Sequence, residues 1–325
     1  MTAPPRLLLS DSARTRLGER LAALAVPVSL EEAERGAPFD AAFVSRDVTG
    51  LSTKHEVQPG TTRFYDAMRA QTALRWVHVH SAGADRPVYV ELRARGVQVT
   101  TSAGTNAAVV AQTALAGVLA LARRFPELLA AQRERRWASL IGTGLPRDLA
   151  GQTAVVVGWG AIGQQIGAWL GMLGLHVVAV RRERAQAEGC AECVAYGDLP
   201  AVLPRADWLV LACPLTERTR GLVDAAALAR LPAGAHLINV ARGEVVDEPA
   251  LIAALRTGRL AGAYLDVFTH EPLPPDSPLW SLPGVIATPH SAGFSDGNAA
   301  RVEALFLDNL ARWRAGQPLR NPALA

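Results

Sequence analysis

Short apolar runs alternate with amphipathic segments along the first hundred residues of the chain. The runs lie at residues 6–10, 41–45, 74–80 and 96–101. Between them are stretches rich in Ala, Leu and Arg whose apolar residues have helical spacing, as in TTRFYDAMRAQTA at 61–73. Strands that alternate with helices form parallel sheets joined by crossover helices. The pattern therefore predicts an α/β domain in this part of the chain.

A long apolar helix is expected next, from about residue 105 to 123, and a second series of strands follows it. The interior strands of this series are continuously apolar, which is typical of a sheet covered by helices on both faces. We expect strands at residues 153–158, 176–180, 192–197, 208–213, 235–240, 262–268 and 285–289. A last helix, near 296–314, comes after the second sheet, and we expect it to pack back on the first domain.

These elements predict the fold class: two α/β domains with parallel sheets, each of the Rossmann or flavodoxin-like kind. The first domain comprises residues 1–102 together with 294–325, and the second comprises residues 103–293.

A glycine-rich turn, GWGAIG, follows the first strand of the second domain and precedes a helical pattern. Gly158 permits the tight turn, Gly160 lets the backbone approach a pyrophosphate, and Gly163 allows close packing of helix and strand. The first N–H groups of the helix then point at the anion. Since a second strand also follows at the right distance, the motif predicts a dinucleotide site in residues 103–293 and leaves the substrate to the other domain.

Two arginines stand where a dinucleotide-binding unit carries an acidic residue. That residue follows the second strand and binds the ribose 2′-hydroxyl. Here the strand HVVAV is followed by Arg181 and Arg182, and Arg181 lies 23 residues after Gly158. A guanidinium pairs with a phosphate through two hydrogen bonds, whereas a carboxylate repels it. We expect NADP(H) to be the preferred cofactor, with NAD(H) possible; the alternative is that both arginines merely end a strand in solvent.

Residues at the ends of three further predicted strands have side chains suited to catalysing a reduction. HLINVARG, YLDVFTHEP and ATPHSAG each lie at or after the carboxyl end of a predicted strand, the edge at which open α/β sheets bind ligands. Arg242 can bind a carboxylate and polarise a carbonyl. His290 can donate a proton to the carbonyl oxygen as hydride arrives, and Glu271 can orient its imidazole. The set fits reduction of a small 2-oxo acid.

In these motifs the chain resembles the D-isomer-specific 2-hydroxyacid dehydrogenase family, and within it the NADPH-preferring glyoxylate/hydroxypyruvate reductase type. The resemblance covers nearly the whole chain and is most specific over residues 239–273 and in TPHSAG. It implies that Arg242, Glu271 and His290 are catalytic, and that Asp266 lies near the nicotinamide carboxamide. It further implies that the backbone of Ala82 and Gly83 takes the substrate carboxylate in a cleft between the domains.

The other cofactor contacts that we expect lie in the same sequence segments. They are Ala161, Ile162, Cys213, Pro214, Val240, Ala241 and Gly293. One departure from the family's pattern is Gln112, which stands where many members carry a glutamate, so that we expect a buried charge to be missing from the long helix.

The amino-acid composition and net charge argue against some classes of binding partner. Of the 325 residues, 50% are hydrophobic and 19% are charged, and the net charge is +3 with no cluster of basic residues. We therefore expect a folded protein that does not bind nucleic acid. No secretory signal is evident, and the apolar segment 107–122 is shorter than the roughly 18 residues of a membrane span, so we expect a cytoplasmic protein with no membrane partner. A homodimer is what the family resemblance implies.

Cys190 and Cys193 form one CxxC without a second pair nearby, and we expect them exposed on a surface segment with no metal or redox role.

Two other functions remain open from the sequence. One is a dinucleotide-sensing regulator without catalytic activity, built on the same scaffold. The other is an NAD-linked dehydrogenase acting on another 2-hydroxy acid such as phosphoglycerate, or on formate. The sequence does not fix the substrate side chain.

Overall fold

The structure is a computed structural model that describes residues 3–53, 55–141, 144–183 and 188–323. The chain divides into two compact units, Met1–Asn106 with Ser295–Ala325 (unit 1) and Ala107–Phe294 (unit 2). These bounds differ by four residues and by one residue from those that the sequence suggested. Both units are α/β with parallel sheets, so the predicted fold class is confirmed for each of them. The cleft between domains stays a prediction.

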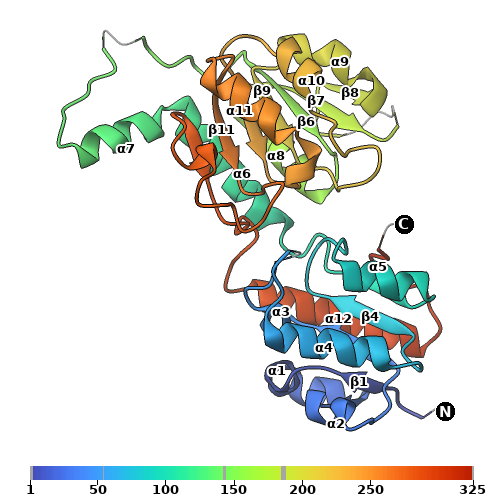
Figure 1. Ribbon diagram of the computed structural model, residues 1–325. Helices are drawn as coiled ribbons and strands as arrows, with labels where there is room; N and C mark the ends of the chain where they lie inside the picture. Colours follow the sequence, from blue (N-terminus) through green and yellow to red (C-terminus); the bar gives the residue numbers. More distant parts are fainter. Residues whose placement is uncertain (1–2, 54, 142–143, 184–187, 324–325) are drawn as a thin grey trace. The chain divides into compact units, whose positions relative to one another are not determined.

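Unit 1 contains one sheet with helices packed on it (Figure 1). Its elements in chain order are β1 (Arg6–Leu8), α1 (Asp11–Ala22), β2 (Val26–Val28), α2 (Leu30–Glu34), β3 (Ala41–Val44), α3 (Arg46–Thr49), α4 (Pro59–Ala70), β4 (Trp76–Val79), α5 (Pro87–Ala94), β5 (Gln98–Thr101) and α12 (Asn298–Arg314). Over the described residues the sheet has five strands in the order β2-β1-β3-β4-β5.

Strand β2 is the element of this sheet that the sequence did not predict. Its sequence is Val-Pro-Val, and Pro27 pairs with Leu7 at the edge of the sheet. Proline has no N–H to donate and is confined to edge strands, so a short run containing it gives no clear strand pattern.

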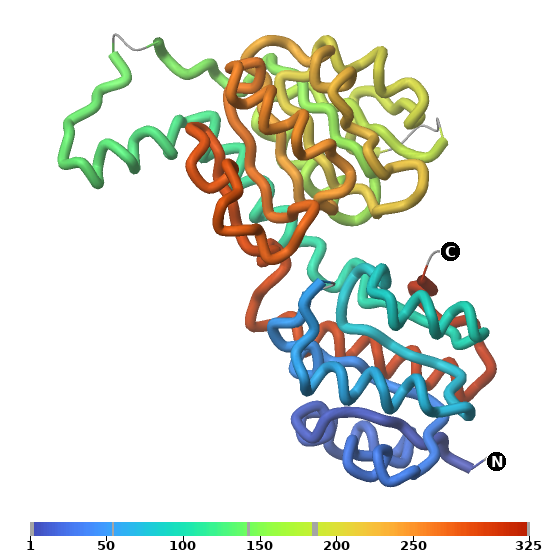
Figure 2. Tube along the Cα trace, in the orientation of Figure 1, coloured from blue at the N-terminus to red at the C-terminus, as the bar shows by residue number. Residues whose placement is uncertain are grey.

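Helix α12 returns to unit 1 after unit 2 is complete, as the sequence predicted. Figure 2 shows this red C-terminal helix running among the blue elements of the N-terminal part of the chain. Phe306 of α12 is fully buried and stacks on Phe43 of β3, with ring centroids 4.2 Å apart. Such aromatic pairs stabilise a fold by about 0.5–1.5 kcal/mol beyond the burial of their area. The C-terminal segment is therefore part of the core of unit 1.

Unit 2 contains the larger sheet. Its elements are α6 (Ala107–Ala122), α7 (Phe125–Arg133), β6 (Thr153–Val157), α8 (Ala161–Met172), β7 (His176–Arg181), β8 (Glu192–Ala195), η1 (Tyr196–Asp198), α9 (Leu199–Val202), η2 (Leu203–Arg205), β9 (Trp208–Leu211), α10 (Ala225–Arg230), β10 (Ala235–Asn239), η3 (Gly243–Val245), α11 (Glu248–Arg256), β11 (Leu260–Leu265), η4 (Pro278–Trp280) and β12 (Val285–Ala287). Over the described residues its sheet has seven strands in the order β12-β11-β10-β9-β6-β7-β8.

The apolar strands of unit 2 are buried on both faces, as their composition predicted. Along β6, Val155 and Val157 belong to one hydrophobic cluster, while Ala154 and Val156 belong to the cluster on the other face. All strand pairs of the sheet are parallel, so every carboxyl end lies at the same edge. The chain order reverses between β6 and β9, and in open α/β sheets ligands bind outside such a switch point.

Two expectations for unit 2 are wrong. Gln112 is exposed on α6 rather than buried. Cys190 precedes β8 and Cys193 lies in it; both are half-buried and pack against the hydrophobic cluster that includes Trp159.

In the part of the chain that the structure describes, no single helix is long and apolar enough to cross a membrane. Helices α6 and α7, bent by 70° at their junction, meet the length and composition of a span when they are taken together.

Candidate active site

The glycine turn lies at the switch point, directly after β6. Gly158 has φ +98°, a conformation that side chains rarely adopt, and an added Cβ would lie 2.6 Å from the backbone of Cys213. An added Cβ on Gly163 would lie 1.8 Å from the Gly158 carbonyl oxygen. Both glycines therefore have the geometric roles that the motif predicts, a tight turn and a close approach of helix to strand.

Gly160 is the N-cap of α8, and the space beside it suits an anion. It has no side chain to cap the helix, and no atom lies within 4 Å of where its Cβ would be. The first helical residues, Ala161 and Ile162, present their N–H groups at this point. A helix N-terminus with free space around it is a natural pyrophosphate site. The residues present thus fit a dinucleotide.

Arg181 lies beside this turn. It is the last residue of β7 and is half-buried, and Arg182 follows it on the surface. The backbone N–H of Gly158 donates to the Val180 carbonyl over 2.8 Å, so the turn and the arginine are adjacent. Arg181 therefore lies at the same sheet edge as the glycine turn.

His290 and Glu271 form an ion pair at the carboxyl edge of the unit 2 sheet, after strands β12 and β11. His290 Nδ1 lies 2.8 Å from Glu271 Oε2, and the backbone N–H of Phe268 donates to Glu271 Oε1 over 3.1 Å. Burial by itself raises the pKa of Glu271. The hydrogen bond and charge of His290, the Phe268 N–H and the charge of Arg242 outweigh it, so the pKa lies below its usual value. The carboxylate is thus ionised at neutral pH and can accept a hydrogen bond from the His290 ring.

The loop that carries His290 is held by Asp266. Asp266 Oδ1 accepts hydrogen bonds from Thr288 Oγ1 (2.7 Å) and Ser291 N (2.9 Å), and Oδ2 accepts one from Ala292 N (3.0 Å). The His290 N–H itself donates to the Asp266 carbonyl over 2.8 Å. His290 has φ +50°, and a non-glycine residue persists in this sparsely populated region when its surroundings fix it. Asp266 and its partners supply that constraint.

Arg242 is positioned by Asn239, a buried residue that the sequence analysis overlooked. Asn239 Oδ1 accepts from Ala241 N over 3.0 Å, and its Nδ2 donates to the Arg242 carbonyl over 3.1 Å. The Arg242 guanidinium is half-buried and donates to the Ala241 carbonyl. A polar residue directly after the apolar pair Leu237–Ile238, at the end of the strand AHLIN, was the available signal. Phe268 and Thr288, which anchor Glu271 and Asp266, gave no such signal.

Most of the predicted site residues lie at this one edge of the unit 2 sheet. The catalytic candidates follow β10, β11 and β12, and the cofactor candidates follow β6, β7 and β9 as well as β10 to β12. These cofactor candidates are Gly158, Gly160, Ala161, Ile162, Gly163, Arg181, Arg182, Cys213, Pro214, Val240, Ala241, Asp266 and Gly293. Ala82 and Gly83 belong to unit 1, after the carboxyl end of β4, where the Gly83 carbonyl accepts a hydrogen bond from Ser81 Oγ.

Two histidines close in sequence to predicted site residues, His78 and His270, differ in environment. His78 is fully buried, with its ring nitrogens 2.8 Å from Thr100 Oγ1 and 3.1 Å from Ser102 Oγ, and burial lowers its pKa to about 3. It is a core residue whose two ring nitrogens both have hydrogen-bond partners. His270, next to Glu271, is exposed.

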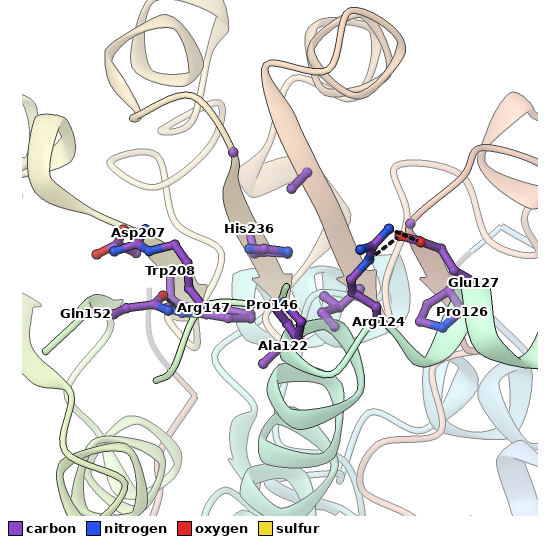
Figure 3. Close-up of a pocket in the computed structure, with 14 residues that line it drawn as sticks. Ala122, Arg124, Pro126, Glu127, Pro146, Arg147, Gln152, Asp207, Trp208 and His236 are labelled. Carbon is purple, nitrogen blue, oxygen red and sulfur yellow. Dashed lines mark hydrogen bonds and ion pairs between the residues drawn. The ribbon is translucent and has the colours of Figure 1, made fainter. Parts of the chain in front are cut away.

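A cavity of about 200 Å³ in unit 2 lies at the opposite edge of the sheet, near the amino ends of β9 to β12. Figure 3 shows His236 and Trp208 at its floor and the Arg124–Glu127 pair at one side. The His236 and Trp208 rings are stacked 4.4 Å apart. None of the predicted catalytic or cofactor residues lines this cavity, so it is separate from the strand ends described above.

Known proteins are similar to this chain in sequence and in fold. Residues 115–292 match the profile described as D-isomer specific 2-hydroxyacid dehydrogenase, NAD binding domain. A glyoxylate reductase of Korarchaeum cryptofilum is 35% identical over 257 residues, which are 78% of this chain and 76% of the relative.

Two solved structures cover almost the whole chain. A D-isomer specific 2-hydroxyacid dehydrogenase from Xanthobacter autotrophicus Py2, in complex with NADPH and MES, has a TM-score of 0.76 at 32% identity and covers 99% of this chain and 98% of its own. An NADPH-dependent glyoxylate/hydroxypyruvate reductase from Sinorhizobium meliloti, in complex with NADP and malonate, has a TM-score of 0.75 at 29% identity and covers 99% and 97%.

The close approach of α8 to the glycine turn can be tested within one helix. Gly163→Ala should lower the free energy of unfolding by about 2 kcal/mol or more, because backbone atoms must move to admit the methyl group. Gly171→Ala, in the same helix with no atom within 4 Å of the added Cβ, should leave stability unchanged or raise it by up to about 1 kcal/mol. Urea unfolding of the two variants measures the difference; equal midpoints would contradict the packing.

The lowered pKa of Glu271 makes a pH-dependent prediction for stability. Its ion pair should stabilise the fold above the unfolded pKa of about 4.3, and this stabilisation should be lost as pH falls through the lower folded pKa. Glu271→Gln should therefore cost about 1–3 kcal/mol at pH 7 and almost nothing at the acid end. Melting curves of both proteins from pH 7 to pH 3 give the comparison, and a difference that grows toward acid would contradict the assignment.

The matching profile, the relatives and the site geometry agree: the chain belongs to the D-isomer specific 2-hydroxyacid dehydrogenase family, oxidoreductases that work with a nicotinamide dinucleotide.

Proposed function

We propose that this protein is an NADP(H)-preferring reductase of small 2-oxo acids such as glyoxylate or hydroxypyruvate, with the D-2-hydroxy acid as product. The observation that carries the proposal is the His290–Glu271 ion pair, which lies within range of the Arg242 charge at the same sheet edge as the glycine turn. The names of the Korarchaeum and Sinorhizobium relatives support this substrate class.

The bound nicotinamide supplies the hydride in this reaction, and the residues of the chain handle the substrate. Arg242 binds the 2-oxo acid through its guanidinium and polarises the carbonyl group. His290 donates its proton to the carbonyl oxygen, and Glu271 holds the imidazole in its protonated form. In our proposal the backbone of Ala82 and Gly83 binds the substrate carboxylate, and Asp266 lies near the carboxamide of the cofactor.

The nucleotide choice rests on Arg181. Arg181 is a half-buried residue at the end of β7, and the residue before it, Val180, accepts a hydrogen bond from the glycine turn that fits a pyrophosphate. The Xanthobacter and Sinorhizobium structures hold NADPH and NADP, which supports the same choice here. A cytoplasmic location remains part of the proposal.

Replacing Arg181 should weaken the preference for the phosphorylated nucleotide. Wild-type kcat/KM should be much higher with NADPH than with NADH, and Arg181→Gln should lower the NADPH value about tenfold or more with little change for NADH. Arg230→Gln removes one positive charge from the exposed end of α10 and serves as the control. Equal kcat/KM for both nucleotides in the wild type would contradict the role of Arg181 and favour the NAD-linked alternative.

An assay of turnover also distinguishes the proposed reductase from a nucleotide-sensing regulator without catalytic activity. Reduction of any small 2-oxo acid with the intact site excludes a purely nucleotide-sensing role. If neither nucleotide supports turnover over a broad set of 2-oxo acids, the regulator becomes the better interpretation.

We further propose that the protein is a homodimer joined through unit 2. Helix α7 and residues 134–141 form an arm that extends away from the sheet of its own unit in Figures 1 and 2. On this arm Phe125 is 51% exposed, Trp137 96% and Ile141 84%. Apolar side chains gathered on one exposed segment mark a protein interface, and the partner that we propose is a second copy of the chain.

Trp137→Ser combined with Ile141→Ser should shift the protein from dimer to monomer, because the interface loses two large apolar side chains. Met172→Ser, at an equally exposed apolar residue of α8 outside the arm, should leave the mass unchanged. Sedimentation equilibrium at micromolar concentration gives the masses. A monomeric wild type, or a double variant that stays dimeric, would contradict the proposal.

A further inference from the structure

Tyr264 is a buried tyrosine of unit 2 to which the reaction described above gives no role. It lies near the carboxyl end of β11, two residues before Asp266, and only 3% of its surface is exposed. A buried tyrosine usually finds a hydrogen-bond partner for its O–H group. That partner is Thr288, whose Oγ1 lies 2.7 Å from the Tyr264 hydroxyl oxygen. The phenol therefore contacts a residue that already anchors the candidate site.

Helix α6 lies directly against the ring of Tyr264. The helix packs on β11, and a Cβ added at Gly117 would lie 2.6 Å from the ring carbon Cγ. Protein interiors are close-packed, so a ring in such contact has little room to move. The absence of a side chain at Gly117 thus provides the space for the ring, and the packing holds the hydroxyl within hydrogen-bond distance of Thr288.

The direction of the two hydrogen bonds between Tyr264 and Asp266 follows from the number of protons. Thr288 Oγ1 donates to Asp266 Oδ1 over 2.7 Å, and a hydroxyl has only one proton to donate. Because that proton is used on the carboxylate, Tyr264 must donate to Thr288. Burial raises the pKa of Tyr264 to about 12, so the phenol keeps its proton and remains a donor at neutral pH.

The two bonds form a chain that ends on the carboxylate of Asp266. Successive hydrogen bonds polarise one another, so the Tyr264 hydroxyl makes Thr288 a stronger donor. The same carboxylate accepts hydrogen bonds from the two backbone N–H groups that directly follow His290, over 2.9 and 3.0 Å. A carboxylate that is held firmly by Thr288 therefore also holds the loop that carries His290.

Few charged groups compete with this chain for control of Asp266. The titratable and charged groups on the strands and loops beside it are Tyr264 on β11, His236 at the far end of β10, Arg242 and Glu244 after β10, His270 and Glu271 after β11, and His290 after β12. The sequences of α6 and β12 contain no ionisable residue. Burial raises the pKa of Asp266, and the hydrogen bond from Thr288 lowers it more than the charge of His290 does.

We infer that Tyr264 is a positioning residue of the proposed reduction: it donates to Thr288, whose hydroxyl holds the Asp266 carboxylate and with it the loop of His290. The inference rests on the proposed function and adds a residue to its machinery. Tyr264 acts through Asp266 and transfers no proton itself.

Tyr264→Phe tests the chain, because it removes the hydroxyl and keeps the ring. Thr288 then becomes a weaker donor, so ionised Asp266 loses stabilisation and its pKa rises. As pH falls, Asp266 should titrate before Glu271, because its pKa is raised and that of Glu271 is lowered. The acid limb of kcat/KM with NADPH should therefore move up by about half to one pH unit. An acid limb at the wild-type position would overturn the inference.

Two further variants distinguish the chain from a general effect on packing. In a Thr288→Val background, Tyr264→Phe should cause no additional shift of the acid limb, because the link is already broken. Thr113→Val removes a hydroxyl of α6 that lies 3.0 Å from the Ala292 carbonyl of the same loop, and should leave the acid limb unchanged. Additive shifts in the double variant, or an equal shift in Thr113→Val, would indicate a purely structural role and overturn the inference.

Failure of the inference and failure of the proposed function give different results. If 2-oxo acids are reduced and Tyr264→Phe shifts nothing, the inference fails and the reductase stands. If no 2-oxo acid is reduced, the proposed function fails, and carbon-13 NMR of protein labelled at the aspartate carboxyl carbons still tests the chain. The Asp266 signal, assigned by its loss in Asp266→Asn, should titrate at higher pH in Tyr264→Phe. An unchanged midpoint would overturn the inference.

Discussion

The buried carboxylate of Asp266 is the constraint on which the candidate site depends. Burial raises its pKa, while hydrogen bonds from Thr288, Ala292 and Ser291 and the charge of His290 lower it in part. A buried polar group whose partners are lost is costly, so Asp266 strongly favours the loop conformation that satisfies it. That conformation holds His290 in its left-handed backbone geometry, from which the imidazole meets Glu271. Asp266 thus positions His290, the proton donor that we propose, without taking part in proton transfer itself.

The parallel sheet of unit 2 explains why the remaining groups lie together. Arg242, Glu271 and His290 follow the adjacent strands β10, β11 and β12, while the glycine turn follows β6 and Arg181 ends β7. One half of the edge therefore carries the groups for acid–base and carboxylate chemistry, and the other half fits a dinucleotide.

Sequence patterns predicted the elements whose structure depends on residues close together in the chain. Continuous apolar runs marked the strands of unit 2, and the spacing of Gly158, Gly160 and Gly163 marked the turn, because each depends on neighbours within a few residues. The edge strand β2 was missed because Pro27 interrupts a very short run. Asn239 and the anchoring role of Asp266 were missed because their hydrogen bonds reach loops whose path the sequence does not show. The half-burial of Cys190 and Cys193 likewise depends on tertiary packing.

The central claim is that His290 is the proton donor of a nicotinamide-dependent reduction. The most direct measurement compares His290→Ala with the wild type in NADPH oxidation by a 2-oxo acid, with NADPH binding followed by fluorescence. The account predicts a loss of kcat/KM of about 10²–10⁴-fold with nearly unchanged NADPH affinity. His270→Ala, at the exposed residue next to Glu271, should keep wild-type turnover. Turnover near the wild-type rate in His290→Ala would contradict the account.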